Sequence, residues 1–251
     1  MVSTSKISKL VNSIKAFYIP PQKPLSSAQK KSAFILAYTA IILTALEYFG
    51  TVRFFSAYFP DAARQHLGLY AQLWWAFCTI LLFLALPMAI IKLSYKEKLS
   101  DYGWKVSVKP SHLLLYFLMF AAVLPLVWFA SKRGDFQMVY PFYRGAYRAS
   151  IQEIFIWETA YLAQFVALEF FFRGFLVLGL ERSMGRLAVW VAAIPYCMIH
   201  YHKPPLEAFA AIAAGIILGE LAQRTRTIMG GAIIHMGVAL SMDMLALSRF
   251  R

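Results

Sequence analysis

Two histidines and one glutamate–arginine pair lie inside stretches of the chain that are otherwise apolar. Glu169 and Arg173 are four residues apart, so on a helix they share a face and can form an ion pair. His200 and His235 lie in two later apolar stretches. A carboxylate and imidazoles can deprotonate a water molecule and stabilise a developing oxyanion, as hydrolysis of a peptide bond requires. The same residue types also bind zinc, and their spacing does not distinguish the two uses.

The elements that position these residues must be membrane-spanning helices, because the composition excludes an ordinary soluble domain. Of the 251 residues, 60% are hydrophobic and 15% are charged, against about 45–50% and about 25% in soluble domains. The formal net charge of +13 is expected to face anionic lipid and not nucleic acid. Cys78 and Cys197 lie in apolar runs, which excludes a disulfide framework. We therefore expect an all-α, multi-pass transmembrane helical bundle.

Hydropathy predicts about seven membrane spans. The fifth and sixth are short and are separated by Lys203-Pro204-Pro205, so we expect either a tight helical hairpin or one helix that stops short of full span. Gly215 and Gly219 in the sixth span predict close packing against a neighbouring helix. The predicted spans are 33–57, 67–93, 113–131, 151–180, 187–202, 206–222 and 228–247.

The distribution of charge and of polar spans divides the chain into three parts. Residues 1–32 are expected to form a basic cytoplasmic tail, residues 33–150 accessory helices and loops, and residues 151–247 a four-helix core. Lysine and arginine are more abundant in the segments on the side of the tail than on the opposite side. This asymmetry predicts a cytoplasmic amino terminus, and we expect the plasma (inner) membrane to be the location.

Several other ionisable residues lie in the predicted spans. A charge at mid-bilayer costs about 2.5–3.5 kcal/mol on insertion scales, so such residues usually face the protein interior or a water-filled cavity. Glu158 shares the helix face of Glu169 but lies about 16 Å away along the axis, so it is a candidate for lining a water track. Glu153 and His202 are expected to be ordinary interfacial residues. Glu47 stands alone in the first span. The carboxylates expected to be solvated near the ends of the sixth span are Glu207 and Glu220.

Two further polar residues are candidates for supporting the histidines. Tyr196 lies four residues before His200, so its hydroxyl and the imidazole share a helix face and can hold each other or a water molecule. Asp243 lies about two turns beyond His235, and its expected role is to orient a neighbour.

In these residues the chain resembles the CPBP family, which contains the type II CAAX prenyl proteases and their bacterial relatives. The family motifs are E-E-x-x-x-R, F-x-x-x-H and H-x-x-x-N, in that order. They are matched in part by Glu169 to Arg173, by Tyr196 to His200 and by His235, all within residues 151–247. The resemblance implies an intramembrane endopeptidase acting on prenylated or otherwise membrane-anchored peptides. In that reaction Glu169 and His200 would activate water, while His235 and Arg173 would stabilise charge.

The chain departs from the family motifs at three positions. Tyr196 replaces a phenylalanine, Leu168 replaces the first glutamate, to which the family's water activation is usually assigned, and Ala239 replaces the asparagine. The last two changes raise an alternative: a family member that has lost proteolysis and acts as a membrane scaffold or an immunity-type protein. The remaining alternative is a transporter with a proton relay, which should show an inverted repeat, and none is visible.

The resemblance leaves the cofactor open. Glu169, His200 and His235 could hold a divalent metal such as zinc, or they could activate water with no metal. The chain lacks the H-E-x-x-H signature by which spacing alone would indicate a metalloprotease.

Overall fold

The computed structural model describes residues 4–18, 24–105 and 109–248, and the regular secondary structure in these ranges is helical. Six of the described helices are long and apolar enough to cross a membrane, and a seventh apolar helix, Leu187–Met198, is shorter. The six are Ser27–Phe49, Pro60–Ser94, His112–Ala130, Ile151–Met184, Pro205–Thr225 and Met229–Ser248. The prediction of a multi-pass helical bundle with about seven spans is confirmed.

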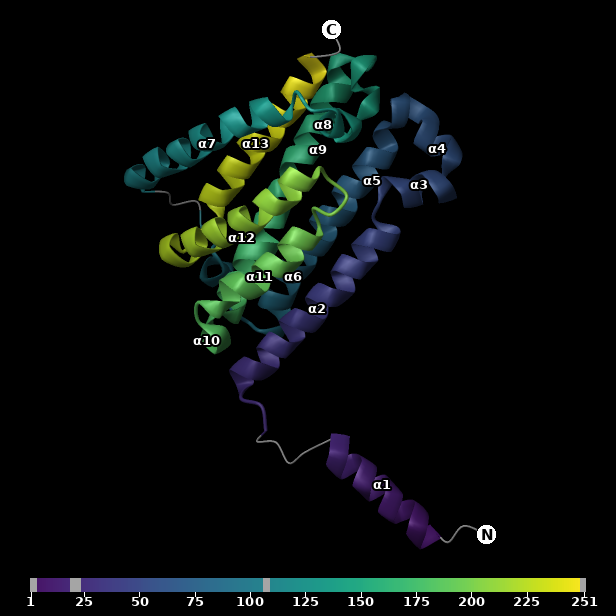
Figure 1. Cartoon of the computed structure of the whole chain (residues 1–251), viewed down its shortest axis with the longest axis vertical. Helices are drawn as coiled ribbons and strands as arrows, with labels where there is room; N and C mark the ends of the chain where they lie inside the picture. The colour runs from purple at the N-terminus through teal and green to yellow at the C-terminus, as the bar shows by residue number, and fades with distance from the viewer. Residues whose placement is uncertain (1–3, 19–23, 106–108, 249–251) are drawn as a thin grey trace.

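The helices follow one another as shown in Figure 1. Two short segments within the second span, η2 and η3, and the segment η6 are π-helical, whereas η1, η4 and η5 are 3-10 helices. In chain order the helices are α1 (Thr4–Tyr18), α2 (Ser27–Phe49), α3 (Val52–Tyr58), α4 (Pro60–Arg64), η1 (Gln65–Gly68), α5 (Leu69–Ile80), η2 (Leu81–Ala85), α6 (Leu86–Ala89), η3 (Ile90–Ser94), η4 (Leu99–Tyr102), α7 (Pro110–Ala130), α8 (Gly134–Val139), η5 (Arg144–Tyr147), α9 (Ile151–Glu169), η6 (Phe170–Leu178), α10 (Gly179–Met184), α11 (Leu187–Met198), α12 (Pro205–Thr225) and α13 (Met229–Ser248).

The first predicted span, 33–57, is wrong at both ends, because capping residues set different limits. Ser26 and Gln29 form a capping box, so α2 begins at Ser27, inside the tail predicted for residues 1–32. Gly50 ends α2, and the hydroxyl of Thr51 accepts a hydrogen bond from the backbone N–H of Phe54 to start α3 as a separate helix. Residues 1–3 and 19–23 of the predicted tail lie outside the described residues.

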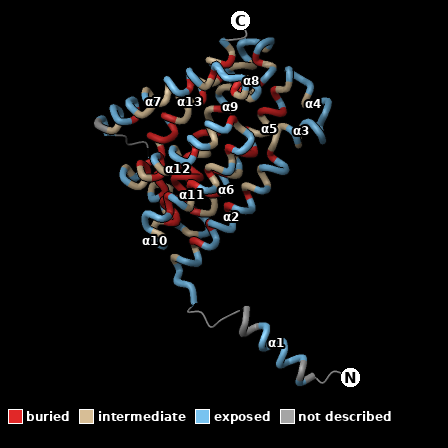
Figure 2. The backbone as a smooth tube through the Cα atoms, in the orientation of Figure 1, coloured by how far each residue is buried: buried red, intermediate tan, exposed pale blue. Residues whose placement is uncertain are grey.

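The continuous helix of α9, η6 and α10 is the centre of the bundle. In its most apolar window 78% of the residues are buried, whereas the other five spans lie between 11% and 44%. Figure 2 shows the same contrast between a buried interior and the exposed outer helices α2 and α7. The outer surface of α7 is apolar, with Leu114 and Phe117 more than half exposed, as expected of a face that contacts lipid tails. The central helix is therefore the element that can carry buried polar groups.

The π-helical segment η6 follows Glu169 directly and was not predicted from the sequence. All nine of its residues are buried. A Cβ atom at Gly174 would lie 2.6 Å from the backbone oxygen of Tyr102, so glycine is needed for the η4 turn to approach η6 this closely. Single turns of π-helix inside α-helices are frequent at functional sites, and here the segment includes Arg173.

Of the two spans predicted to be short, only α11 is short, whereas α12 has 21 residues and is long enough to cross a membrane. With twelve residues, α11 is too short to cross a bilayer alone, and it packs along α12. A Cβ atom added at Gly219 would lie 2.8 Å from Val189, and one at Gly215 would lie 3.1 Å from the ring of Tyr196. The two glycines therefore let α12 approach α11 closely, as their spacing predicts.

A polar cluster ties α2 to the turn that precedes η4. Glu97 accepts hydrogen bonds from Lys31 Nζ and from the hydroxyl of Tyr102, each at 2.5 Å. Burial alone would raise the pKa of the Glu97 carboxyl, but these two hydrogen bonds outweigh it, so the pKa lies below its usual value. The carboxylate therefore remains charged at neutral pH and holds α2 against η4.

Candidate functional site

The centre of the site is a fully buried ion pair on the central helix. The side chains of Glu169 and Arg173 are 0% and 2% exposed, and Oε1 of the glutamate lies 3.2 Å from Nη1 of the arginine. The guanidinium also lies over the ring of Tyr196, 4.2 Å from its centroid, a favourable cation–π geometry. Its Nη2 is 3.5 Å from the backbone oxygen of Ala214. The pair predicted from the four-residue spacing is thus present, and each charge has a partner.

His235 on α13 contacts the same carboxylate. Its Nδ1 donates a hydrogen bond to Glu169 Oε1 over 3.1 Å, and its ring packs against Phe165 with centroids 4.5 Å apart. Glu169 therefore binds both Arg173 and His235. A carboxylate that accepts from Nδ1 fixes the orientation and the tautomer of a histidine ring.

Gly231 makes room for the Glu169 carboxylate. A Cβ atom at this position would lie 2.4 Å from Oε2 of Glu169, too close for any side chain. We expect Gly231→Ala to displace the carboxylate from His235, to destabilise the fold by about 1–3 kcal/mol through overpacking, and to abolish cleavage of a membrane peptide.

A matched control for Gly231→Ala is Gly134→Ala, because no atom lies within 4 Å of a Cβ at Gly134. Thermal unfolding and cleavage should be measured on both variants. Parental activity in the Gly231 variant would contradict the position assigned to the carboxylate.

His200 follows the end of α11 and is held in one tautomer. Its Nδ1 lies 2.7 Å from the backbone oxygen of Tyr196. A carbonyl oxygen only accepts hydrogen bonds, so Nδ1 carries the proton and Nε2 keeps a lone pair. The predicted partner was the hydroxyl of Tyr196; the structure instead gives its backbone carbonyl, together with ring packing at 4.9 Å between centroids. His200 is 5% exposed, and the free Nε2 makes it a candidate base.

The two histidines line one cavity of about 240 Å³, which we call the histidine cavity. Most of its wall is apolar or aromatic and comes from α2, α5 and α9. Leu168, at the position of the first glutamate of the family motif, is part of this wall. Glu169 is fully buried and is not part of the wall, so it acts on the cavity through His235. Glu47, His202 and Lys203 also line the cavity.

Gln164 is a further polar residue of the histidine cavity, and the sequence analysis missed it. It lies on α9, is 4% exposed, and its Nε2 has no hydrogen-bond partner among the described residues. The usual signal of a site in a membrane span is an ionisable side chain, and the amide of Gln164 is neutral. An amide inside the 19-residue apolar helix Ile151–Glu169 was the available signal.

Asp243 and Glu158 form a second buried acidic group away from the histidine cavity. Asp243 is 0% exposed and interacts with Trp157, and neither acidic residue is part of the cavity wall. Asp243 interacts with Glu158, which places Glu158 beside α13 and not beside Glu169. From the sequence, Glu158 was a candidate for lining a water track and Asp243 for supporting the histidines. Neither residue is part of the wall of the histidine cavity.

The residues expected at the membrane interface form ion pairs with charged neighbours. Glu153 caps α9 through Ser150 and contacts His66 at 2.8 Å. His202 is 81% exposed and lies 3.2 Å from Glu47 of the first span. The remaining two expected interfacial carboxylates also have basic partners, Glu207 with Lys203 at 2.8 Å and Glu220 with Arg186 at 2.9 Å.

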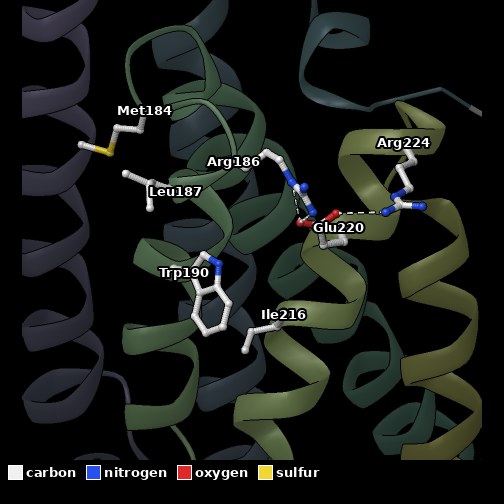
Figure 3. Close-up of a pocket in the computed structure, with 7 residues that line it drawn as sticks. All are labelled: Met184, Arg186, Leu187, Trp190, Ile216, Glu220 and Arg224. Carbon is white, nitrogen blue, oxygen red and sulfur yellow. Dashed lines mark hydrogen bonds and ion pairs between the residues drawn. The ribbon is translucent and has the colours of Figure 1, made fainter.

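A larger groove of about 640 Å³ lies where α10, α11 and α12 meet, and none of the candidate catalytic residues lines it (Figure 3). Glu220 lies between Arg186 and Arg224 in this groove, and Trp190 and Ile216 form its apolar wall. Because each arginine is paired with the same carboxylate, the groove presents no cluster of free charge.

The residues of the site do not fit a metal ion. Among the described residues, no group of three or more His, Cys, Asp or Glu side chains is arranged to hold one. The guanidinium of Arg173 beside Glu169 opposes a second cation. The ligand set of Glu169, His200 and His235 that the sequence left open is therefore not formed.

Fold and site together define a class: a multi-pass helical integral membrane protein with a buried Glu–Arg–His cluster beside a cavity that holds a second histidine. The family model described as type II CAAX prenyl endopeptidase Rce1-like matches residues 150–241, from the start of α9 into α13. Over this segment the chain is similar to the CPBP/CAAX intramembrane proteases, which supports the resemblance noted in the sequence. No curated protein and no solved structure matches the chain.

Proposed function

We propose that this protein is an intramembrane endopeptidase that hydrolyses a peptide anchored in the membrane, in the manner of CAAX-type proteases. The observation that carries the proposal is that His200 and His235 line one cavity, with Glu169 and Arg173 buried directly behind His235. An apolar cavity with a few convergent polar groups is the usual form of a binding site. The predominantly apolar wall favours a lipid-modified substrate such as a prenylated carboxyl-terminal peptide.

In the proposed reaction His200 is the general base. A water molecule in the histidine cavity gives one proton to Nε2 of His200 while its oxygen attacks the carbonyl carbon of the scissile bond. The tetrahedral intermediate collapses as the C–N bond breaks, and the protonated His200 returns the proton to the leaving nitrogen. The sequence assigned water activation to Glu169 as well. Because Glu169 contacts His235 and is outside the cavity wall, we assign it the positioning of His235.

His235 and Arg173 stabilise charge in this scheme. Glu169 and Arg173 together carry no net charge, so His235 adds one positive charge next to the cavity when it takes up a proton. That charge is balanced when the oxyanion of the intermediate forms, in surroundings where electrostatic interactions are weakly screened. The positive charge of the cluster therefore stabilises the negatively charged transition state more than it stabilises the neutral peptide.

The proposal is tested by reconstituting the full chain in liposomes with a farnesylated peptide that carries a fluorophore and a quencher on either side of the expected cleavage site. We expect cleavage by the parent protein, with mass spectrometry identifying a single internal bond. No cleavage across a panel of prenylated, acylated and unmodified membrane peptides would overturn the proposal.

Leu168 and Ala239 favour a second candidate function. Because they replace two polar residues of the family motifs, the chain could be a membrane scaffold or an immunity-type protein without proteolysis. The panel of peptides separates the two functions, since a scaffold binds partners and cleaves none of the peptides.

We expect cleavage to be independent of a divalent metal, since no metal-holding group is formed among the described residues and Arg173 beside Glu169 opposes a second cation. Adding EDTA or phenanthroline to the reconstituted protein should leave the rate unchanged. A loss of activity that zinc restores would contradict this prediction.

We further propose that the amino terminus faces the cytoplasm and that the protein resides in the plasma membrane, with lipid as its surroundings. The support is the excess of lysine and arginine on the side of residues 1–32. An amino-terminal tag should resist protease in right-side-out vesicles and be cleaved in inverted ones. The reverse pattern would overturn the orientation.

A further inference from the structure

The site contains no side-chain donor at the position where the family motif has an asparagine. That position is Ala239, which is 3% exposed and packs with Tyr161 and Phe165. The nearby Ser241 donates its hydroxyl proton to the backbone oxygen of Gly237 at 2.7 Å, so it is already used. A developing oxyanion needs donors that are positioned before the reaction begins. His235 alone would have to supply them.

Gln164 is a buried donor with no partner that lines the same cavity. It lies on α9 one turn before Leu168, and both side chains are part of the cavity wall with His200 and His235. The amide Nε2 is buried without a hydrogen-bond partner among the described residues. An unpaired buried donor lowers stability unless something else binds it. Such a group is typical of a site that binds an acceptor from a ligand.

Resting on the function proposed above, we propose that Gln164 is a catalytic residue whose side-chain amide donates a hydrogen bond to the carbonyl oxygen of the scissile peptide bond. It thereby supplies from α9 the donor that Ala239 lacks on α13. Gln164 and His235 then bind the oxyanion together while His200 handles the proton. The amide carries no charge, so its bond strengthens as negative charge develops on the oxygen. The contribution is therefore expected in kcat more than in KM.

The test replaces the amide with an apolar side chain of similar length, Gln164→Met. We expect kcat to fall by about 10²–10³-fold, as when one oxyanion donor is removed, with KM nearly unchanged. The melting temperature should stay the same or rise, since the variant removes an unpaired buried donor. Gln164→Asn keeps an amide but shortens its reach, and its kcat should lie between those of the parent and of the methionine variant.

Gln72→Met is the matched control, because Gln72 is a buried glutamine on α5 whose Nε2 donates to the backbone oxygen of Phe142 at 2.8 Å. Losing a satisfied hydrogen bond should lower the melting temperature of this variant, with a far smaller loss of kcat than in Gln164→Met. Gln164→Met is thus expected to lose kcat but not stability, whereas Gln72→Met is expected to lose stability with little loss of kcat.

A peptidyl phosphonate, which carries an anionic tetrahedral oxygen, gives a second measurement. Its affinity should weaken in Gln164→Met by the same factor as kcat, whereas binding of the uncleaved peptide should not change. If the parent cleaves the peptide and Gln164→Met retains parental kcat and phosphonate affinity, the role of Gln164 is overturned and the proposed function stands. If the parent cleaves nothing, the proposed function falls, and the role of Gln164 falls with it.

Discussion

We expect Glu169→Gln to abolish measurable peptide cleavage and to lower the free energy of unfolding by about 3–5 kcal/mol, the usual cost of breaking a buried ion pair. The variant leaves Arg173 charged in a site where it is 2% exposed. Glutamine still offers an oxygen to Nδ1 of His235, so the ring keeps its orientation. What is lost is the negative charge that stabilises a protonated His235. Unfolding in mixed micelles and cleavage in liposomes measure the two effects.

A double variant separates charge balance from catalysis. Arg173→Met alone leaves Glu169 buried and unpaired, and it should be as damaging as Glu169→Gln. Combining the two removes both charges, and we expect most of the lost stability to return while activity stays absent. The control is Glu220→Gln, because its partners Arg186 and Arg224 are 78% and 76% exposed; exposed pairs contribute less than about 1 kcal/mol. Additive losses in the double variant would contradict a coupled pair.

The second large effect is expected for His200→Asn, with kcat reduced by about 10²–10⁴-fold, the range attributed to general acid–base catalysis. The amide of asparagine can donate to the backbone oxygen of Tyr196 as Nδ1 does. The fold should therefore be retained, with a melting temperature close to that of the parent. No atom of asparagine replaces the lone pair of Nε2. Cleavage rates measured with enzyme in excess over substrate isolate the chemical step.

His66→Asn is the control for His200→Asn. His66 is half exposed and contacts Glu153 on the outside of the bundle. Its backbone φ of 49° lies in the left-handed region, which asparagine tolerates better than most residues. We expect parental activity in this variant. Equal losses in both variants would indicate a general effect of replacing histidine and would remove the support for His200 as the base.

The sequence predicts the class of fold and the ion pair because both depend on local information. Long apolar stretches define the spans, and the four-residue spacing alone brings Glu169 to Arg173. Contact between Glu169 and His235 joins residues 66 positions apart, and no periodicity predicts it. Only the order of the motifs suggested that these two residues meet. The structure brings them into contact and places His200 in the cavity wall beside His235.

Other features depend on packing that the sequence does not reveal. A prediction from residue types paired the hydroxyl of Tyr196 with His200, whereas the backbone carbonyl is the partner. The end of α2 at Phe49 depends on Gly50 and Thr51, but the hydropathy pattern predicts one span that continues through these two residues. The π-helical segment η6 depends on contacts with η4. Gln164 has no charge to draw attention to it, and its lack of a partner is a property of the folded chain.

The ion pair also bears on how the chain enters the membrane. Glu169 and Arg173 lie on one continuous helix, so the carboxylate has its counter-charge as soon as that helix has been synthesised. His235 emerges from the ribosome only 66 residues after Glu169. Until then, the ion pair with Arg173 leaves no uncompensated charge at these two positions for the translocon to transfer into lipid. Arg173, which balances the charge of Glu169 in the site, thus also favours insertion of the central helix into the membrane.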